Sequence, residues 1–468
     1  KLTSLIAGSL DYMPSGGIYN VRMQLRQPSL ENTAPSDLSA LLRASTEYLL
    51  KEAYNQTNCD LSYLWKELDQ SEQLDIRVAQ QLILDSLPFY LRQLGGVHKQ
   101  GNLRILLAQW DDSRRKQKEY TKFPDKIAEF EKEKQSALAG IQTLLQEDEN
   151  VQRTVLGAVR SKIADYQYTL ASIPFELFQH ADDAVVELAE IKSHFISADA
   201  DVTELLPEHV KRFMVIFNEH SLSIIHWGRT VNSIGPAGFP GRERGFHQDL
   251  EKMLLLSASD KSSDHKVTGK FGLGFKSVLL ACDKPGIVSG QLATQIIADL
   301  CPVPLKDASN LRVLLTEKTP DRKYQGTLVN LPFEEKMPEE IISSFNQLAG
   351  FMTIFSKQIR RIDVIAGKGQ SWWHWNPTKE VLDDGLSIEI DRTPLPKTDP
   401  SELSLYFRLN NGGVLTAFGP KRFQKLPKYL PGIWVVTPLT EMNGLGIAVN
   451  CDFELDAGRG RLAGCMAV

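Results

Sequence analysis

The hydrophobic pattern changes its period near residue 165, and this change constrains the fold more than any other feature of the chain. From Ser36 to about residue 165, apolar residues recur at helical spacing, as in QLDIRVAQQLILDSLPFYLRQLGG, which closes on Gly95 and Gly96. From about 166 to 335, helix and strand patterns alternate, which is typical of an α/β layer. The sequence therefore predicts a helical region followed by α/β structure.

Shorter patterns predict individual elements. The segments RFMVIFNE and LSIIHWG are expected to be neighbouring strands, VLLACDKPGIVSG a helix, turn and strand, and GTLVNLPF a late strand. Beyond Pro338, a helix in EEIISSFNQLAGFMTIFSKQI precedes strands in RRIDVIAG, LSIEIDR and LSLYFRLN. The Trp372, Trp373 and Trp375 cluster predicts a strand with packed aromatic rings; an aromatic platform for bases has no supporting basic run.

These patterns divide the 468 residues into four parts: an irregular arm over 1–35, a helical domain over 36–165, an α/β domain over 166–335 and a smaller α/β domain over 336–468. Within the helical domain, both charges alternate along a helix that is interrupted near Pro124. A solvated helical face is the simplest interpretation of that helix, and a partner-binding helix is the alternative.

Composition excludes some classes of protein. A formal net charge of −5 gives no global attraction to nucleic acid or anionic lipid, although a local basic patch stays open. No run of eighteen apolar residues exists, so no membrane span is expected. The five cysteines are scattered and odd in number, which favours reduced thiols in a cytoplasmic protein. The chain begins without methionine and stops just after a motif, so we expect part of something longer.

Three segments carry the residues that matter for the chemistry. In PFELFQHADDAVVE, Glu176 and His180 are four residues apart and share a helix face, with Asp183 on the next turn. A carboxylate followed by a second polar group one turn along could hold a water and a metal-bound phosphate. Farther on, LSIIHWGRTVN predicts a strand that runs into a turn at Gly228.

The third segment is KVTGKFGLGFKSVLL. Its glycines at 269, 272 and 274 precede a helical run, so their amides could surround phosphates, and Lys276 would add a positive charge. The polar stretch before it, SASDKSSDHKVTG, suits a lid over bound nucleotide. Alone, such a glycine pattern is more often a flexible loop.

Together these segments resemble the motifs of the GHKL, or Bergerat-fold, ATPases, which are related to the heat-shock chaperone ATPases. ELFQHADDA is similar to the ExxxNAxDA box, HWG stands where most members have DxG, and GKFGLGFKSV resembles the branch of sacsin and the plant NO VEIN proteins. GTLVNLP and GLGIAVNCDFELDAGRGRLA are similar to later segments of that branch. The resemblance covers about 166–468, with five blocks in the expected order.

The resemblance implies a Bergerat-type α/β sandwich that binds ATP over 166–335 and a truncated, transducer-like middle domain over 336–468. It implies that Glu176 is the general base and that Arg459 reaches the γ-phosphate; an ordinary surface ion pair is the alternative for Arg459. The residues that it implies for ATP binding are Asp183, His226, Gly228, Gly269, Gly272, Gly274, Phe275, Lys276 and Thr327.

Two residues depart from the family pattern. His180 replaces the asparagine that binds Mg²⁺, and magnesium prefers oxygen ligands. Three alternatives follow: His180 contacts the metal through a water, the site binds a softer metal such as Mn²⁺, or hydrolysis is weakened. His226 stands in place of the aspartate that accepts the adenine amino group. Only a neutral imidazole could accept that bond, so we expect affinity for ATP to fall as the pH drops through about 6.5.

The expected function is an ATP-binding and ATP-hydrolysing module, with ATP and Mg²⁺ or Mn²⁺ as cofactors. By the resemblance, its lid and second domain close around nucleotide and drive a larger chaperone-like or defence-type protein. The alternatives are a degenerate ATPase that acts as a structural switch, and a DNA-processing machine, which the net charge disfavours. Partners are expected to be further domains or other proteins, and a homodimer stays open.

Overall fold

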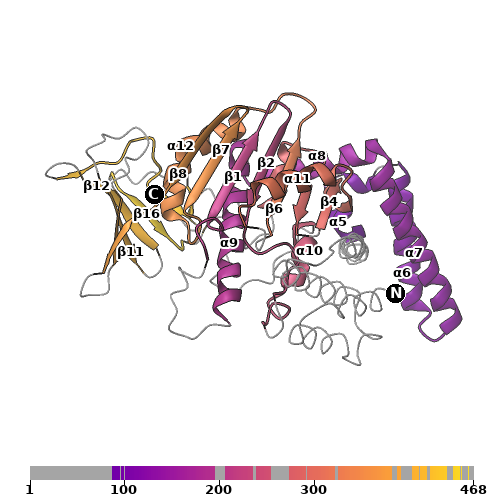
Figure 1. Ribbon diagram of the computed structural model, residues 1–468. Helices are drawn as coiled ribbons and strands as arrows, with labels where there is room; N and C mark the ends of the chain where they lie inside the picture. The colour runs from indigo at the N-terminus through magenta and orange to yellow at the C-terminus, as the bar shows by residue number, and fades with distance from the viewer. Residues whose placement is uncertain are drawn as a thin grey trace, which may run out of the picture. The chain divides into compact units, whose positions relative to one another are not determined.

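The computed structural model is a mixed α/β structure with an N-terminal helical region and two mixed β-sheets (Figure 1). It describes residues 87–94, 96–99, 101–194, 206–235, 239–254, 274–290, 292–321, 325–381, 387–391, 403–409, 412–418, 422–439, 446–453, 455 and 462. The predicted arm and the predicted helix beginning at Ser36 lie outside these residues.

Contacts divide the chain into two compact units that are not contiguous in sequence. Unit 1 comprises 1–163, 230–260 and 278–331, and unit 2 comprises 164–229, 261–277 and 332–468. The domain boundaries predicted at 165 and 335 stay predictions.

Unit 1 begins with helices. They are α5 (Leu87–Gln93), η3 (Val97–Lys99), α6 (Gly101–Glu119), α7 (Pro124–Glu147) and α8 (Glu149–Asp165). The last two residues of α8 belong to unit 2. The predicted interruption near Pro124 is confirmed, since α6 ends before this proline and α7 starts on it, where a missing N–H costs nothing. Helices α6 and α7 lie side by side (Figure 1). Trp110 on α6 is buried in one hydrophobic cluster with Ala137 and Leu138 on α7.

The strands of unit 1 lie in the order β5-β4-β3-β6, and each neighbouring pair is antiparallel. Their bounds are β3 (Gly286–Ser289), β4 (Leu292–Ile297), β5 (Cys301–Pro304) and β6 (Thr327–Pro332), and the unit's other helices are η5 (Phe246–Gln248), α10 (Asp249–Leu254) and α11 (Ala308–Lys318). The predicted strands in GIVSG and TLVNLP are therefore confirmed.

Unit 2 contains η4 (Leu170–Ser172), α9 (Ile173–Ser193), β1 (Arg212–Phe217), β2 (Ser221–His226), α12 (Glu340–Phe355), β7 (Arg361–Ala366) and β8 (Gly369–His374). These strands lie in the order β2-β1-β7-β8, with β1 parallel to β7 and the other pairs antiparallel. The core is aromatic: Phe213 on β1 lies 5.1 Å from Phe178 on α9 and 6.0 Å from Phe345 on α12, between ring centroids. The predicted neighbouring strands β1 and β2 are confirmed.

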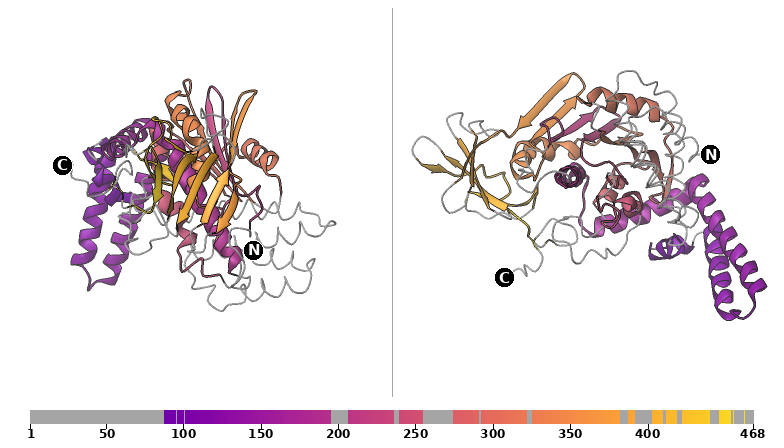
Figure 2. Two further views of the ribbon diagram at one scale, coloured as in Figure 1. Left: turned by 90° about the vertical axis from the view of Figure 1, so that its left-hand side faces the viewer. Right: turned by 60° about the horizontal axis from the view of Figure 1, so that its bottom comes forward.

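A second sheet completes unit 2, and its strands lie side by side in Figure 2. Its order is β15-β14-β16-β12-β11-β10-β9, with β13 paired to β12. The bounds are β9 (Thr378–Val381), β10 (Ser387–Asp391), β11 (Leu403–Leu409), β12 (Gly412–Phe418), β13 (Phe423–Gln424), β14 (Ile433–Val435), β15 (Thr437–Pro438) and β16 (Ala448–Cys451). The pair β14–β16 is parallel, which makes this sheet mixed as well.

The tryptophan cluster differs from its prediction. Trp375 is buried and donates its indole N–H to Glu389 Oε2 at 3.1 Å. Trp372, in contrast, is 59% exposed, and the Arg361 guanidinium lies 5.2 Å from its ring centroid. The expectation of a fully packed aromatic strand is therefore wrong for Trp372, because β8 is the last strand of its sheet.

The structure bears on the expected absence of a membrane span and on the state of the cysteines. No helix in the described part of the chain is both long and apolar enough to cross a membrane. Among the described cysteines, Cys282, Cys301 and Cys451 are free thiols. Burial raises the pKa of the Cys282 and Cys301 thiols to about 12, so these two pack as small hydrophobic side chains.

We expect Tyr90→Phe to destabilise unit 1. The buried Tyr90 hydroxyl on α5 donates to Asp299 Oδ2 at 2.7 Å, so the change removes a hydrogen-bond donor from a buried carboxylate. The free energy of unfolding should fall by about 1–3 kcal/mol, measured by urea denaturation. The control is Tyr120→Phe, because the Tyr120 hydroxyl bonds to no described residue. An unchanged midpoint in Tyr90→Phe would show that this bond does not stabilise the fold.

Candidate functional site

Helix α9 carries the candidate acid–base residues. It begins at Ile173, with Pro174 in its first turn, where proline is favoured, and it runs to Ser193. Its spacing places Glu176 and His180 one turn apart on the same face. The Glu176 side chain is only 5% exposed, so its carboxylate lies inside unit 2 and not on a solvated helix surface.

Gly274 lies directly against these two side chains. A methyl group added at Gly274 would overlap Glu176 Oε2 and lie 2.6 Å from His180 Nε2. Ser277 holds the glycine in place, because its backbone N–H and its hydroxyl donate to Gly274 O at 3.2 and 2.7 Å. The last glycine of the glycine-rich segment thus meets the acidic helix, as only a residue without a side chain can.

The helical run after Gly274 is short. It is the six-residue 3₁₀ helix η6 (Phe275–Leu280), in which Phe275 is buried and Lys276 is 0% exposed. The structure therefore places the Lys276 side chain within the protein interior. Gly269, Gly272 and the predicted lid segment lie outside the described residues, as does Arg459.

The turn after β2 brings a third segment to α9. A Cβ atom at Gly228 would lie 2.5 Å from the Ala184 carbonyl carbon and 2.6 Å from the Val185 nitrogen, so glycine permits this approach. The Arg229 N–H donates to Ala184 O at 2.8 Å, and Arg229 Nε lies 2.7 Å from Glu187 Oε2. The predicted turn at Gly228 is confirmed, and it is bonded to the helix that carries Glu176.

His226, at the end of β2, is held as a neutral imidazole. Burial, with a smaller effect from the neighbouring His180, lowers the pKa of His226 to about 3. The Gly228 N–H donates to its Nδ1 atom at 3.2 Å, so the remaining proton resides on Nε2. His226 therefore presents a donor at Nε2 and not the acceptor that the resemblance implies for adenine. Without a ligand, this pKa keeps the imidazole neutral through pH 6.5. The expected fall in affinity for ATP through that range stays a prediction.

Two neighbouring aspartates on α9 bind the segment between α12 and β7. The Lys357 ammonium lies 3.2 Å from Asp183 Oδ1. Asp182 is not among the predicted site residues. It is 1% exposed and accepts the backbone N–H groups of Lys357, Gln358 and Ile359 at 2.7, 2.9 and 2.9 Å. Burial raises the pKa of the Asp182 carboxyl, and the three N–H groups oppose that shift.

A local sequence signal for Asp182 did exist. It lies four residues after Phe178 and three before Val185, and all three side chains are buried on one face of α9. A carboxylate on the apolar face of a helix must find partners inside the protein. Which partners it finds depends on residues about 175 positions later in the chain.

Thr327 belongs to unit 1 and is buried there. Its hydroxyl shares a 2.7 Å hydrogen bond with the Ser289 hydroxyl, which accepts the Val231 N–H at 2.8 Å. Its predicted contact with the nucleotide stays a prediction. Of the residues expected from sequence, the structure brings together Glu176, His180, Gly274, His226 and Gly228 in unit 2.

The predicted metal site has few protein ligands. The described residues contain no group of three or more His, Cys, Asp or Glu side chains that could hold a metal ion. Beside Gly274 there is one carboxylate and one imidazole, and magnesium prefers oxygen ligands. The protein groups described therefore provide only part of a magnesium shell, and metal binding at His180 stays a prediction.

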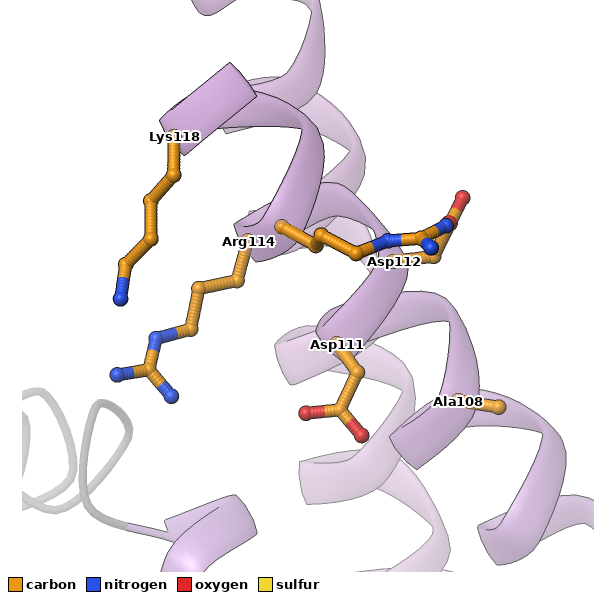
Figure 3. A pocket seen from close by; sticks show the side chains of 6 residues that line it. Ala108, Asp111, Asp112, Arg114 and Lys118 are labelled. Atoms are coloured by element: carbon orange, nitrogen blue, oxygen red, sulfur yellow. The ribbon is translucent and has the colours of Figure 1, made fainter.

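A hollow of about 550 Å³ lies elsewhere, along α6. Asp111, Arg114 and Lys118 project from one side of the helix into it (Figure 3). Its lining mixes both charges, and none of the predicted site residues belongs to it. We assign it no functional role.

Neither a comparison with known protein families nor a search of curated proteins finds a match to this chain.

The low pKa of His226 predicts a loss of stability in mild acid. Near pH 7 the imidazole is largely neutral in both the folded and the unfolded chain. Between about pH 6.5 and 3 the unfolded chain binds a proton that the folded chain does not, so stability falls as the pH falls. From pH 7 to pH 5 this one group should lower the free energy of unfolding by about 2 kcal/mol.

Chemical denaturation of the wild type and of His226→Asn at both pH values measures this effect. The variant should lose less stability than the wild type between pH 7 and pH 5. The exposed His220 provides the control, and His220→Asn should keep the wild-type loss. Equal losses in the wild type and His226→Asn would contradict the buried, neutral state of His226.

Proposed function

We propose that this chain binds ATP at the cluster formed by Glu176, His180, Gly274 and His226, and that it hydrolyses the bound nucleotide. The observation that carries the proposal is the meeting of three separate segments in unit 2. The acidic helix, the end of the glycine-rich segment and the turn after β2 all approach one another there. The sequence of each segment, or its resemblance to the ATPase motifs, predicts a role in phosphate or base binding.

The family is part of the proposal. The order of the five sequence blocks supports a GHKL ATPase of the sacsin and NO VEIN branch, with a Bergerat-type sandwich around α9. The mixed sheet and the position of Glu176 on a helix packed against β1 are compatible with that architecture. By the same resemblance, the module would drive conformational change in a larger chaperone-like or defence-type protein.

Glu176 is the proposed general base. Its carboxylate is buried beside a glycine backbone, so a water held between this carboxylate and the γ-phosphate would be shielded from bulk solvent. Because position 274 is glycine, its backbone can approach the Glu176 carboxylate closely, and in this proposal the phosphate binds beside that contact. A divalent cation, when bound, would neutralise phosphate charge and take ligands from phosphate oxygens and water in addition to the protein.

The tautomer of His226 changes the proposed base contact. An Nε2–H donor cannot accept a bond from the adenine amino group, but it can donate to a purine ring nitrogen. Base recognition through His226 would then rely on a ring acceptor. ATP could then bind without a hydrogen bond from the adenine amino group to this residue.

A second function, nucleotide binding as a structural switch without efficient turnover, is favoured by His180. This residue places an imidazole nitrogen beside Glu176, where an oxygen ligand would suit magnesium better. The switch and the ATPase share the same binding site. They differ only in whether the wild-type chain turns ATP over.

Gly274→Ala should weaken ATP binding without unfolding the chain. The added methyl overlaps the ends of two side chains, Glu176 and His180, which can shift while the backbone stays in place. Overpacking of this kind costs about 1–3 kcal/mol of folding stability. The displaced side chains should also lower the affinity for ATP by about tenfold or more, measurable by calorimetry with ATP and Mg²⁺. The control is Gly369→Ala on β8, where the methyl would meet only Ala366 O, at 3.4 Å. Equal affinities in the two variants would remove Gly274 from the proposed site.

Glu176→Gln should lower the hydrolysis rate by about 10²–10⁴, the usual contribution of a general base, and leave ATP affinity nearly unchanged. The glutamine keeps the size of the side chain and removes its ability to take a proton. Phosphate release under single-turnover conditions separates the chemical step from binding. A parallel loss of affinity would mean that Glu176 is needed for structure rather than chemistry.

The same assay distinguishes the switch from the ATPase. A wild-type chain that binds ATP but shows no turnover with Mg²⁺ or Mn²⁺ acts as a switch. If metal binding limits the rate, His180→Asn restores an oxygen ligand and should raise Mg²⁺-dependent turnover. Unchanged or lower turnover in that variant would identify His180 as an adapted part of a working site.

A further inference from the structure

The six residues Phe355–Arg360, here called the 355–360 segment, join α12 to β7 within unit 2. They contact two parts of the unit that are far apart in sequence. One is α9, which carries Glu176 and His180, and the other is the second sheet. These contacts suggest more than a connection between a helix and a strand.

Toward α9, the segment is held by its backbone. Three successive N–H groups, of Lys357, Gln358 and Ile359, donate to the buried Asp182 carboxylate, and the Lys357 ammonium pairs with Asp183. Because Asp182 is buried, water cannot easily replace these donors if the segment moves away. A shift of α9 along or around its axis would therefore carry the segment with it.

Toward the second sheet, the segment is held at Phe355. Asn450 on β16 donates its side-chain N–H to Phe355 O at 3.2 Å, and its Oδ1 accepts the Val436 N–H at 2.9 Å. The Phe355 ring lies 4.6 Å from the Trp434 ring on β14 and 5.8 Å from the Tyr406 ring on β11, between centroids. The segment thus reaches three strands of the second sheet from one residue.

Internal bonds make the segment stiff. The Arg360 guanidinium donates to Ser356 O at 2.8 Å, which closes the segment on itself. The Ser356 N–H donates to Met352 O at 3.0 Å, so the start of the segment is tied to the last turn of α12. The Ser356 hydroxyl makes its shorter contact with Ile359 O, inside the segment. A short segment bonded in this way transmits a displacement more readily than it absorbs one.

We propose that the 355–360 segment couples α9 to the second sheet, so that a change in the position of α9 alters the packing of β14 and β16. The coupling rests on contacts within unit 2 alone. It goes beyond the proposed nucleotide chemistry and holds whether or not ATP is the ligand, so a failure of either proposal leaves the other standing.

Amide hydrogen exchange measured by mass spectrometry tests the coupling in the full chain without nucleotide. Asp182→Asn keeps the shape of the side chain but turns an acceptor oxygen into an NH₂ group that faces a backbone donor. Exchange should accelerate by about threefold or more at 357–359 and also in peptides that cover β14 and β16. In the reverse direction, Asn450→Leu should accelerate exchange at 357–359, because coupling is reciprocal.

The matched control is Asp363→Asn. Asp363 is another fully buried carboxylate of unit 2, on β7, and its partners are the guanidinium groups of Arg212 and Arg361. Its loss should accelerate exchange around β7 and leave β14 and β16 unchanged. Two outcomes overturn the proposal: Asp182→Asn affects 357–359 alone, or Asp363→Asn affects β14 and β16 equally.

A milder variant keeps the test valid if Asp182→Asn does not fold. Lys357→Met removes only the ion pair to Asp183 and leaves the three backbone donors in place. It should accelerate exchange at 357–359 and at β14 and β16 in the same ratio as a folded Asp182 variant, with a smaller amplitude. A change confined to residues 357–359 would again overturn the coupling.

Discussion

The Asp182 carboxylate, buried in unit 2, is the interaction on which the arrangement of the candidate site most depends. A carboxylate taken out of water costs several kcal/mol unless hydrogen bonds replace its hydration. Here three consecutive backbone N–H groups do so, and the turn at Gly228 holds α9 through a second set of contacts. The helix is therefore fixed from two directions. Glu176 lies six residues and His180 two residues before Asp182 on the same helix, so their positions are determined by the same bonds.

The electrostatics of the site follow from this burial. Where two histidines lie close together inside a protein, desolvation and mutual repulsion both favour the neutral forms, and His226 accordingly titrates far below its ordinary range. A triphosphate beside these groups would act in the opposite direction, since negative charge stabilises a protonated imidazole. The protonation state of the cluster is thus set by its contents as well as by burial. The dependence on the contents arises because an imidazole can gain a proton in this range, whereas an amide or a carboxylate would keep one charge state.

Much of the fold could be predicted from the sequence where the determining signal is local. The break at Pro124, helix α9 and the strands β1 and β2 follow from the missing N–H of proline and from hydrophobic spacing. The nearness of Glu176 and His180 follows from helical geometry in the same way. The exposure of Trp372 could not be predicted, because it depends on β8 being the last strand in its sheet. Nor could the tautomer of His226, which depends on the turn geometry at Gly228.

Asp182 is partly predictable from local sequence and partly dependent on distant residues, and it links the site to the rest of unit 2. Its burial is a local consequence of helix spacing, but its partners come from the 355–360 segment, which in turn contacts Asn450 and Trp434 of the second sheet. Because Glu176 and Asp182 share one helix, the position of the proposed base and the packing of the second sheet belong to one equilibrium. A ligand that binds one arrangement of α9 more tightly must therefore also favour the packing of the second sheet that goes with that arrangement. A partner that binds one packing of the second sheet must favour the matching position of α9 by the same coupling free energy. The bonds that position Glu176 therefore also make it sensitive to what the second sheet binds.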